Sequence, residues 1–208
     1  MLYPVRTPRL FSLVYPGCTW SVPDAGRAVY LSFDDGPEPE VTPRVLDLLG
    51  EAGVRASFFC IGKNVEAHPR IFDRILQEGH AVGNHSFSHL NGWKTDDARY
   101  LEDVARARAI IPSRLFRPPY GRARRSQMKQ LMAPPLNMKI IMWSLLSGDF
   151  DTGRSAGQCW VSVDKYLGPG QIVTFHDSLK AAPRLLYVLP KLLQKMRDEK
   201  LEGRALEM

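Results

Sequence analysis

Short apolar runs, each followed by glycine, proline or acidic residues, recur from residue 28 to the end of the chain. Runs of about four to eight apolar residues between such turn signals predict buried strands. Between them, apolar residues at helical spacing predict helices, some of which begin at a capping side chain such as Thr42, Asn64 or Thr95. The predicted strands are 28–31, 56–61, 81–82, 115–117, 138–146 and 171–175, with an edge strand at 204–206; the predicted helices are 42–52, 64–78, 95–111, 126–132, 158–167 and 183–199.

Strands and helices that alternate in this way are typical of βα units, in which successive strands lie parallel. We therefore expect one α/β domain with about six to seven parallel strands, closed into an incomplete barrel. Residues 28–208 form this domain, and residues 1–27 are expected to pack on it as an N-terminal segment. The apolar run 10–15 within that segment is too short to span a membrane, so no membrane-spanning segment is predicted.

Composition and charge add little to this picture of a globular domain. The chain has 208 residues, of which 44% are hydrophobic and 24% charged. Its net charge of +6 favours an anionic partner or surface. The basic stretch 114–129 has no nucleic-acid-binding motif beside it, so we expect no nucleic-acid partner. Three widely spaced cysteines, Cys18, Cys60 and Cys159, argue by their odd number against a disulfide framework.

Polar residues gather just after the ends of the predicted strands. Asp34 and Asp35 follow the first strand, on which a regular backbone would point them to opposite faces. Gly36 and Pro37 then break the strand and can turn both carboxylates toward one cleft, although an acidic surface turn is the alternative interpretation. Because the carboxyl ends of parallel strands share one rim, we expect these carboxylates to lie near three later groups: His85 with His89, Asp149, and His176.

Two histidines in this set suggest a metal site. His85 and His89 are four positions apart, so on a helical turn both imidazoles could face one metal ion. Together with one Asp they give three protein ligands and leave positions open, as in a catalytic metal site. Two packed or surface histidines are the alternative, and the same ligand types also form the iron site of non-haem oxygenases. His68 and His80 have no such partners and are expected to be structural.

Five segments of the chain resemble, in order, the five motifs of the polysaccharide deacetylases of carbohydrate esterase family 4. The resemblance extends from about residue 29 to residue 177. It implies a distorted (β/α) barrel with its site on the open rim, and a hydrolase that removes N-acetyl groups from N-acetylglucosamine-containing polysaccharide, peptidoglycan or a chitin-like chain. The five segments are Ser32-Phe33-Asp34-Asp35-Gly36-Pro37, His85-Ser86-Phe87-Ser88-His89, Arg117-Pro118-Pro119-Tyr120-Gly121, Asp149-Phe150 and His176-Asp177.

The resemblance implies a role for the residues of the first three motifs. Asp34 would be the general base, and Arg117 would orient it. Asp35, His85 and His89 would hold a divalent metal ion, zinc foremost, with Co²⁺ or another divalent ion as alternatives. A metal ion of this kind would polarise the acetyl carbonyl and acidify a water molecule, which are two of the requirements of amide hydrolysis.

The third requirement of amide hydrolysis is a proton for the leaving amine, and the resemblance assigns it to the last motif, His176-Asp177. His176 would be the general acid, with Asp149 as its acidic partner, on the opposite side of the carbonyl from the base. The backbone N–H of Tyr120, in the turn that begins at Pro118 and Pro119, would bind the oxyanion.

The chain departs from the family pattern at three positions. Leu146 stands where an earlier Asp is common, Phe150 replaces the usual Trp, and Thr174 replaces an apolar residue two positions before His176. Phe150 and Thr174 would line the pocket for the acetyl methyl group, so they bear on the acyl group and the rate more than on the reaction class.

Other functions remain open at this stage. An O-acetyl esterase or a non-catalytic glycan-binding module would use the same scaffold, and a non-haem iron oxygenase would use the same three ligands. The oxygenase leaves Arg117, Asp149 and His176 without a role. No clear secretory signal is present, which indicates a cytoplasmic location by default, although the expected substrates lie outside the cytoplasm.

Overall fold

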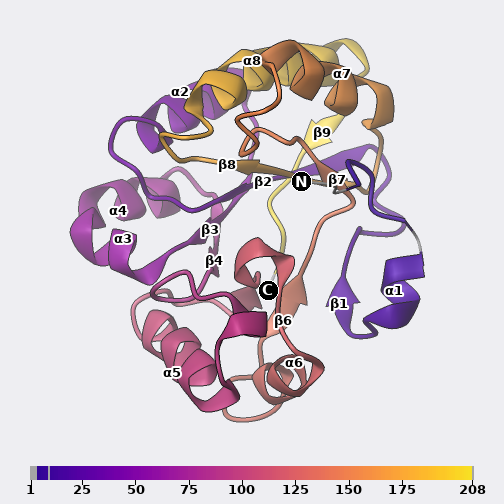
Figure 1. The fold of residues 1–208 in the computed structure, drawn as a ribbon. Coiled ribbons are helices and arrows are strands. Elements are labelled where there is room, and N and C mark those ends of the chain that lie inside the picture. Colours follow the sequence, from indigo (N-terminus) through magenta and orange to yellow (C-terminus); the bar gives the residue numbers. More distant parts are fainter. Residues whose placement is uncertain (1–3, 9, 208) are drawn as a thin grey trace.

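The computed structural model describes residues 4–8 and 10–207, and its centre is a curled, parallel β-sheet (Figure 1). Eight strands of this part of the chain lie in the order β1-β6-β5-β4-β3-β2-β8-β7, and β9 pairs with the start of β2. The predicted α/β architecture, a distorted and incomplete (β/α) barrel, is confirmed, with more strands than the six to seven expected. The strands are β1 (Cys18–Thr19), β2 (Ala28–Asp34), β3 (Ser57–Cys60), β4 (Ala81–Asn84), β5 (Leu115–Phe116), β6 (Lys139–Ile141), β7 (Leu145–Leu146), β8 (Ile172–His176) and β9 (Glu202–Gly203).

Helices cover the outside of the sheet. Every residue of β2 is buried, because β3 and β8 pair with its two edges and helices pack on its outer face. Figure 1 shows α2, α7 and α8 together over β2 and β8, and α6 beside β6, while α5 packs against α6 and β4. The helices are α1 (Leu10–Val14), α2 (Thr42–Ala52), α3 (Gly62–Ala67), α4 (Pro69–Gln77), α5 (Asp97–Arg108), α6 (Arg125–Met132), α7 (Ala156–Tyr166) and α8 (Ala182–Asp198).

The apolar face of α8 shows why the sequence folds in this way. Its buried residues recur at helical spacing and face the sheet and the neighbouring helices α2 and α7. Two predictions about the core hold: Cys60 is a buried core residue, and the three cysteines are free. The buried face of α8 consists of Leu185, Val188, Leu189, Leu192, Leu193 and Met196.

The prediction of one strand over 138–146 is wrong. The structure divides this apolar run into β6, which pairs with β5 and β1, and β7, which pairs with β8. These partners lie at opposite ends of the strand order, so the chain crosses the open side of the barrel between Ile141 and Leu145. Apart from the exposed Lys139 and from Ser144, the run is apolar because both strands and the crossing are largely buried.

The bounds predicted for the first helix, 42–52, are confirmed, but the three predicted capping residues are wrong, because each of their side chains is used elsewhere. Thr42 lies inside α2, and its hydroxyl accepts a hydrogen bond from the Glu38 backbone. Asn64 lies inside α3 and donates its side-chain amide to a site loop described below. Asp96, rather than Thr95, caps α5.

Two predicted elements have different bounds from those expected. The predicted helix 64–78 is interrupted at His68, the residue before Pro69, and forms two helices, α3 and α4. The predicted edge strand 204–206 is displaced to β9, at Glu202–Gly203.

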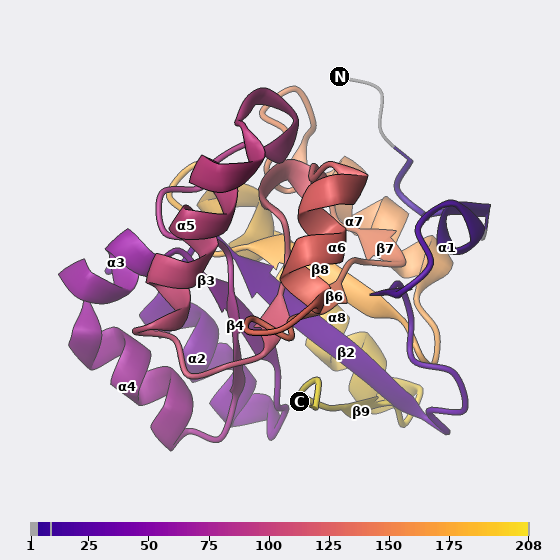
Figure 2. The same cartoon turned by 90° about the horizontal axis from the view of Figure 1, so that it is seen from below.

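The N-terminal segment contacts both edges of the sheet. Arg6 forms an antiparallel bridge with Leu145 of β7, and the Leu146 N–H donates to the Val5 carbonyl at 2.8 Å. Farther along the chain, β1 pairs with β6 at the other edge. Residues 5–8 and 10–19 therefore occupy the open side of the barrel. Figure 2 shows α1 on the same side of β2 as β7, with α3 and α4 on the other side. In the described part of the chain, no helix is both long and apolar enough to cross a membrane.

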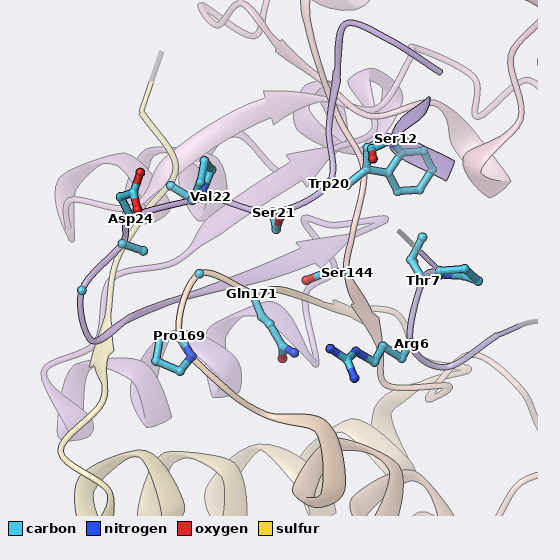
Figure 3. A pocket seen from close by; sticks show the side chains of 15 residues that line it. Arg6, Thr7, Ser12, Trp20, Ser21, Val22, Asp24, Ser144, Pro169 and Gln171 are labelled. Carbon is cyan, nitrogen blue, oxygen red and sulfur yellow. The ribbon is translucent and has the colours of Figure 1, made fainter. Parts of the chain in front are cut away.

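A polar cavity of about 420 Å³ lies at the end of the barrel where the strands begin. Figure 3 shows the Arg6 guanidinium and the Gln171 carboxamide pointing toward each other across it. The cavity lies at the amino ends of β7 and β8, because its lining includes Ser144, just before β7, and Gln171, just before β8. None of the residues predicted to form the site lines this cavity; they lie at the opposite, carboxyl end of the sheet.

Candidate active site

The carboxyl end of β2 delivers the two adjacent aspartates. Asp34 ends the strand and is 3% exposed, while Asp35 adopts a φ of 85° that turns the chain out of the strand. Gly36 then passes so close to Asp177 that a Cβ atom would lie 2.1 Å from its Oδ2. Only glycine fits there, so the backbone can turn as predicted and both carboxylates reach the same rim.

The structure brings the three predicted metal ligands together. One ligand atom each from Asp35, His85 and His89 lies within 4.8 Å of the others. Asp35 Oδ1 is 3.3 Å from His89 Nε2 and 3.8 Å from His85 Nε2. His85 Nδ1 is hydrogen-bonded to the Arg117 carbonyl at 2.7 Å, which directs Nε2 to the site. This oxygen and nitrogen donor set fits a divalent ion such as zinc with open coordination positions.

Electrostatics favour the ligand forms of these side chains. Burial lowers the pKa of His85 to about 4, against the attraction of Asp34, so the imidazole is neutral near pH 7. Burial alone would raise the pKa of Asp35, but the hydrogen bond from His89 and the nearby histidines hold it well below its usual range. A neutral imidazole and an ionised carboxylate are the forms that bind a metal ion.

The loop that carries the two histidines is not the predicted helical turn. Ser86 and His89 have φ values of 60° and 57°, outside the helical region. The Asp103 Oδ2 atom accepts hydrogen bonds from the backbone N–H groups of Phe87 and Ser88, both at 2.9 Å. Asp103 on α5 therefore holds the loop, a role that nothing in the sequence indicated.

Asp34 is paired with Arg117, as the resemblance implied. Arg117 is fully buried, and its Nη1 lies 2.6 Å from Asp34 Oδ1. The same Nη1 donates to Ser32 Oγ at 2.9 Å, while Nη2 and Nε donate to the carbonyls of Met142 and Ile141. These bonds fix the guanidinium and engage Asp34 Oδ1, which leaves Oδ2 for other chemistry. Ser32 is a member of this network that the sequence did not single out.

His176, which is partly exposed, and the buried Asp149 form a second pair. His176 Nδ1 lies 2.9 Å from Asp149 Oδ1, and the His176 backbone N–H donates to Asp149 Oδ2 at 2.8 Å. Burial disfavours the imidazolium, but the charge and hydrogen bond of Asp149 outweigh it and raise the pKa of His176 to about 9. His176 is therefore charged near pH 7, with Nε2 as its remaining N–H donor. The Phe150 ring packs beside it, 5.0 Å between ring centroids.

The turn after β5 lies against the metal ligands. Pro119–Gly121 form a 3₁₀ turn in which Tyr120 has a φ of 60°. The Tyr120 ring is 59% exposed and its centroid is 4.6 Å from that of His89. Pro118 and Pro119 thus lead into a turn that places Tyr120 beside the candidate ligand His89.

Thr174 takes part in the network below the base. Its hydroxyl is fully buried, 3.0 Å from Ser32 Oγ, and Thr174 is paired in register with Leu146 of β7. Through Ser32 the hydroxyl is linked to Arg117 and Asp34. A polar residue is tolerated at this position because it has a hydrogen-bond partner.

Asp177 is a site residue for which the sequence predicted no role. Its Oδ1 accepts the Gly36 N–H at 3.0 Å, and the Thr42 hydroxyl lies 2.5 Å from its Oδ2. Burial raises the pKa of Asp177 to about 8. This side chain ties the end of β8 to the loop that carries Asp35, and Asn64 holds the same loop by donating to the Asp35 carbonyl at 2.7 Å.

Comparisons with known proteins agree with the motif resemblance. The family model for polysaccharide deacetylase matches residues 21–134. One Bacillus cereus peptidoglycan-N-acetylglucosamine deacetylase is 30% identical over 187 residues, covering 87% of both chains. Another, from the same organism, is 36% identical over 156 residues, covering 72% of this chain and 56% of that protein. The chain thus spans little more than half the length of that second relative.

The fold comparison extends over nearly the whole chain. The crystal structure of the Bc1960 peptidoglycan N-acetylglucosamine deacetylase superposes with a TM-score of 0.86 and 30% identity, covering 96% of this chain and 95% of that one. The family model, the sequence relatives and the fold comparison agree, and the chain belongs to the polysaccharide deacetylase family.

Proposed function

We propose that the protein is a metal-dependent hydrolase that removes N-acetyl groups from N-acetylglucosamine-containing polysaccharide, with peptidoglycan as the substrate class. The observation that carries this proposal is the set of three arrangements on one rim: the ligand triad, the Arg117–Asp34 pair and the Asp149–His176 pair. The similarity to two peptidoglycan-N-acetylglucosamine deacetylases supports the choice of substrate.

In this proposal Asp34 is the general base. When bound by Asp35, His85 and His89, a divalent ion would polarise the acetyl carbonyl and make a nearby water more acidic. Arg117 engages Asp34 Oδ1, so Oδ2 is the atom that accepts the proton of the attacking water. The buried guanidinium also keeps this carboxylate in one orientation, which favours a short proton transfer.

His176 is the general acid. Its Nδ1 is held by Asp149, and its raised pKa keeps a proton available on Nε2 at neutral pH. That proton passes to the amine nitrogen as the carbon–nitrogen bond breaks, because an amine is a poor leaving group without it. The backbone N–H of Tyr120 is proposed to bind the oxyanion, and Phe150 to border the acetyl methyl group. Thr174, which has no exposed surface, cannot border that group directly and instead bonds to Ser32.

The rival functions use less of this arrangement. A non-haem iron oxygenase needs the ligand triad but neither acid–base pair. A glycan-binding module without catalysis would not need a buried arginine fixed against a carboxylate at the cost of desolvation.

The proposal is tested by measuring acetate release from peptidoglycan, from N-acetylglucosamine oligomers and from acetylated xylan, with the protein loaded with zinc or cobalt and with a chelator added. We expect acetate from peptidoglycan or the oligomers, abolished by the chelator and restored by the metal. Acetate release from acetylated xylan alone would show an O-acetyl esterase and would refute the proposed N-deacetylase. Release that persists after complete removal of metal would refute metal dependence.

A further inference from the structure

An apolar groove of about 270 Å³ runs from the active site toward the N-terminal segment. Three of its lining residues, Pro118, Tyr120 and Leu146, belong to or adjoin the site described above. Its other wall comes from the N-terminal segment, including Phe11 of α1 and Trp20. The groove is therefore continuous with the rim that carries the ligand triad, and we call it the aromatic groove.

The lining of the aromatic groove is rich in large rings that no other side chain covers completely. Trp93 is 53% exposed, Tyr120 59% and Phe11 40%. Aromatic faces of this kind suit ligands with an apolar face and polar edges. A volume below the about 300 Å³ typical of sites for drug-sized molecules matches a single ring-sized group.

The edge of the aromatic groove supplies polar contacts beside these rings. The Arg122 guanidinium lies 5.0 Å from the Trp93 ring centroid, at the groove lining, and Trp93 is fixed by donating its Nε1–H to the Ala123 carbonyl. A pyranose ring has this mixed character, with C–H groups on its faces and hydroxyl groups at its edge. The hydroxyl groups of such a ring can accept hydrogen bonds from a guanidinium.

Contacts along the chain hold the N-terminal wall in place. The Thr7 hydroxyl donates to the Trp143 carbonyl at 2.8 Å, and Arg125 of α6 donates to the Val14 carbonyl at 3.3 Å. The rings of Phe11 and Trp20 pack edge-to-face, 5.7 Å between centroids. The groove is thus formed before a ligand enters, which lowers the entropic cost of binding.

We propose that the aromatic groove is a glycan subsite, which holds a sugar unit next to the one whose acetyl group is removed, with residues 4–8 and 10–20 as its outer wall. The inference rests on the proposed function in assigning a glycan, and it adds that the N-terminal segment sets the preference for chain length. A single N-acetylglucosamine unit reaches only the ligand triad, whereas a longer chain also contacts Trp93 and Phe11.

The test compares Trp93→Ala and Phe11→Ala with Leu10→Ala as the matched control. Leu10 lies on the same helix as Phe11 and is 64% exposed, but it does not line the groove. For each variant, kcat/KM is measured on N-acetylglucosamine dimer and pentamer and on a short acetyl ester, after circular dichroism has shown an unchanged fold. Trp93→Phe serves as the conservative variant, because it keeps an aromatic face.

We expect each alanine variant at the groove to lower kcat/KM on the pentamer by between about 2-fold and 10-fold, and to lower the ratio of pentamer to ester by the same factor. Trp93→Phe should recover most of the loss, and Leu10→Ala should behave as the wild type. An unchanged ratio in both groove variants would overturn the subsite, as would an equal loss on ester and pentamer.

Binding separates this inference from the proposed function. Pentamer affinity is measured by calorimetry with Asp34→Asn, alone and combined with Trp93→Ala. If Trp93→Ala weakens pentamer binding while the wild-type protein releases no acetate, the deacetylase is refuted and the subsite is supported. If the wild-type protein releases acetate but Trp93→Ala leaves the pentamer affinity unchanged, the subsite is overturned and the deacetylase is still supported. Failure of the pentamer to bind at all overturns the subsite as well.

Discussion

Asp149→Asn is expected to move the alkaline limb of the pH–rate profile to lower pH. In the proposed mechanism His176 acts as an acid only while it is protonated, so the rate should fall as pH rises through its pKa. The structure raises this pKa from 6.5 to about 9, and of the groups that raise it Asp149 contributes most, by charge and by its hydrogen bond to Nδ1. Asparagine removes the charge while burial, which lowers the pKa, remains.

The size of the expected displacement follows from the pKa shift of His176. The difference between about 9 and 6.5 is about 2.5 pKa units, on the order of 3 kcal/mol in favour of the imidazolium. Asp34 and Asp35 supply a smaller part, and a bound cation would reduce that part. Loss of the Asp149 charge should therefore move the alkaline limb down by at least about 1 pH unit.

The assay is kcat and kcat/KM for acetate release between about pH 5 and pH 10, where the two quantities report the substrate complex and the free enzyme. Asp73→Asn is the control, because it removes an exposed carboxylate on α4, far along the chain from the site. An alkaline limb that stays in place in Asp149→Asn, or moves upward, would refute the assignment of His176 as the acid supported by Asp149. A limb that moves equally in the control would point to a general charge effect.

Three further perturbations test the other parts of the site. His85→Ala should lose the bound divalent ion, because two donors are too few for tight binding; full occupancy by elemental analysis would contradict this. Asp34→Asn should keep the metal and lower kcat by about 10²–10⁴-fold, and an empty site would mean that Asp34 is a ligand rather than the base. Asp177→Asn should weaken metal affinity by about 10-fold to 100-fold in a chelator competition, with a smaller effect for Thr42→Val; unchanged affinity in Asp177→Asn would show that this side chain does not position the loop that carries Asp35.

Much of the rim could be predicted because parallel strands carry a strong local signal. The strand β2, buried along its whole length, begins in the sequence with the apolar run 28–31, and the chain turns out of it at Asp35 and Gly36. The same holds for β8, which ends at His176. Since all these strands run parallel, the polar residues after each apolar run had to meet at one end of the sheet.

The neighbours of each strand could not be predicted from the same signal. Apolar content indicates burial but does not say what covers a residue, so the run 138–146 reads as one strand although its two ends pair at opposite edges of the sheet. β1 was missed because Cys18–Thr19 is too short for any periodicity to appear. Both errors concern the open side of the barrel, where the closing contacts are made by distant parts of the chain.

Helix capping failed for a related reason. Local rules place Thr42 and Asn64 at helix starts, since their side chains can accept backbone N–H groups. In the fold, the Thr42 hydroxyl contacts Asp177, and the Asn64 amide donates to the Asp35 carbonyl. Both side chains support the loop that carries Asp35, so the demands of the site override the local preference.

Two site residues to which the sequence assigned no role, Asp103 and Asp177, share one physical task. Asp103 accepts backbone N–H groups of the histidine loop and Asp177 accepts that of Gly36, as the predicted Asp149 accepts that of His176. Each carboxylate comes from a different element from the loop that it holds, so no local pattern can identify it. A loop whose backbone N–H groups are bonded in this way keeps its geometry when a ligand is absent. The ligand triad and the acid are therefore positioned by the fold before metal or glycan binds, which is the condition under which fixed donors lower the barrier of a reaction.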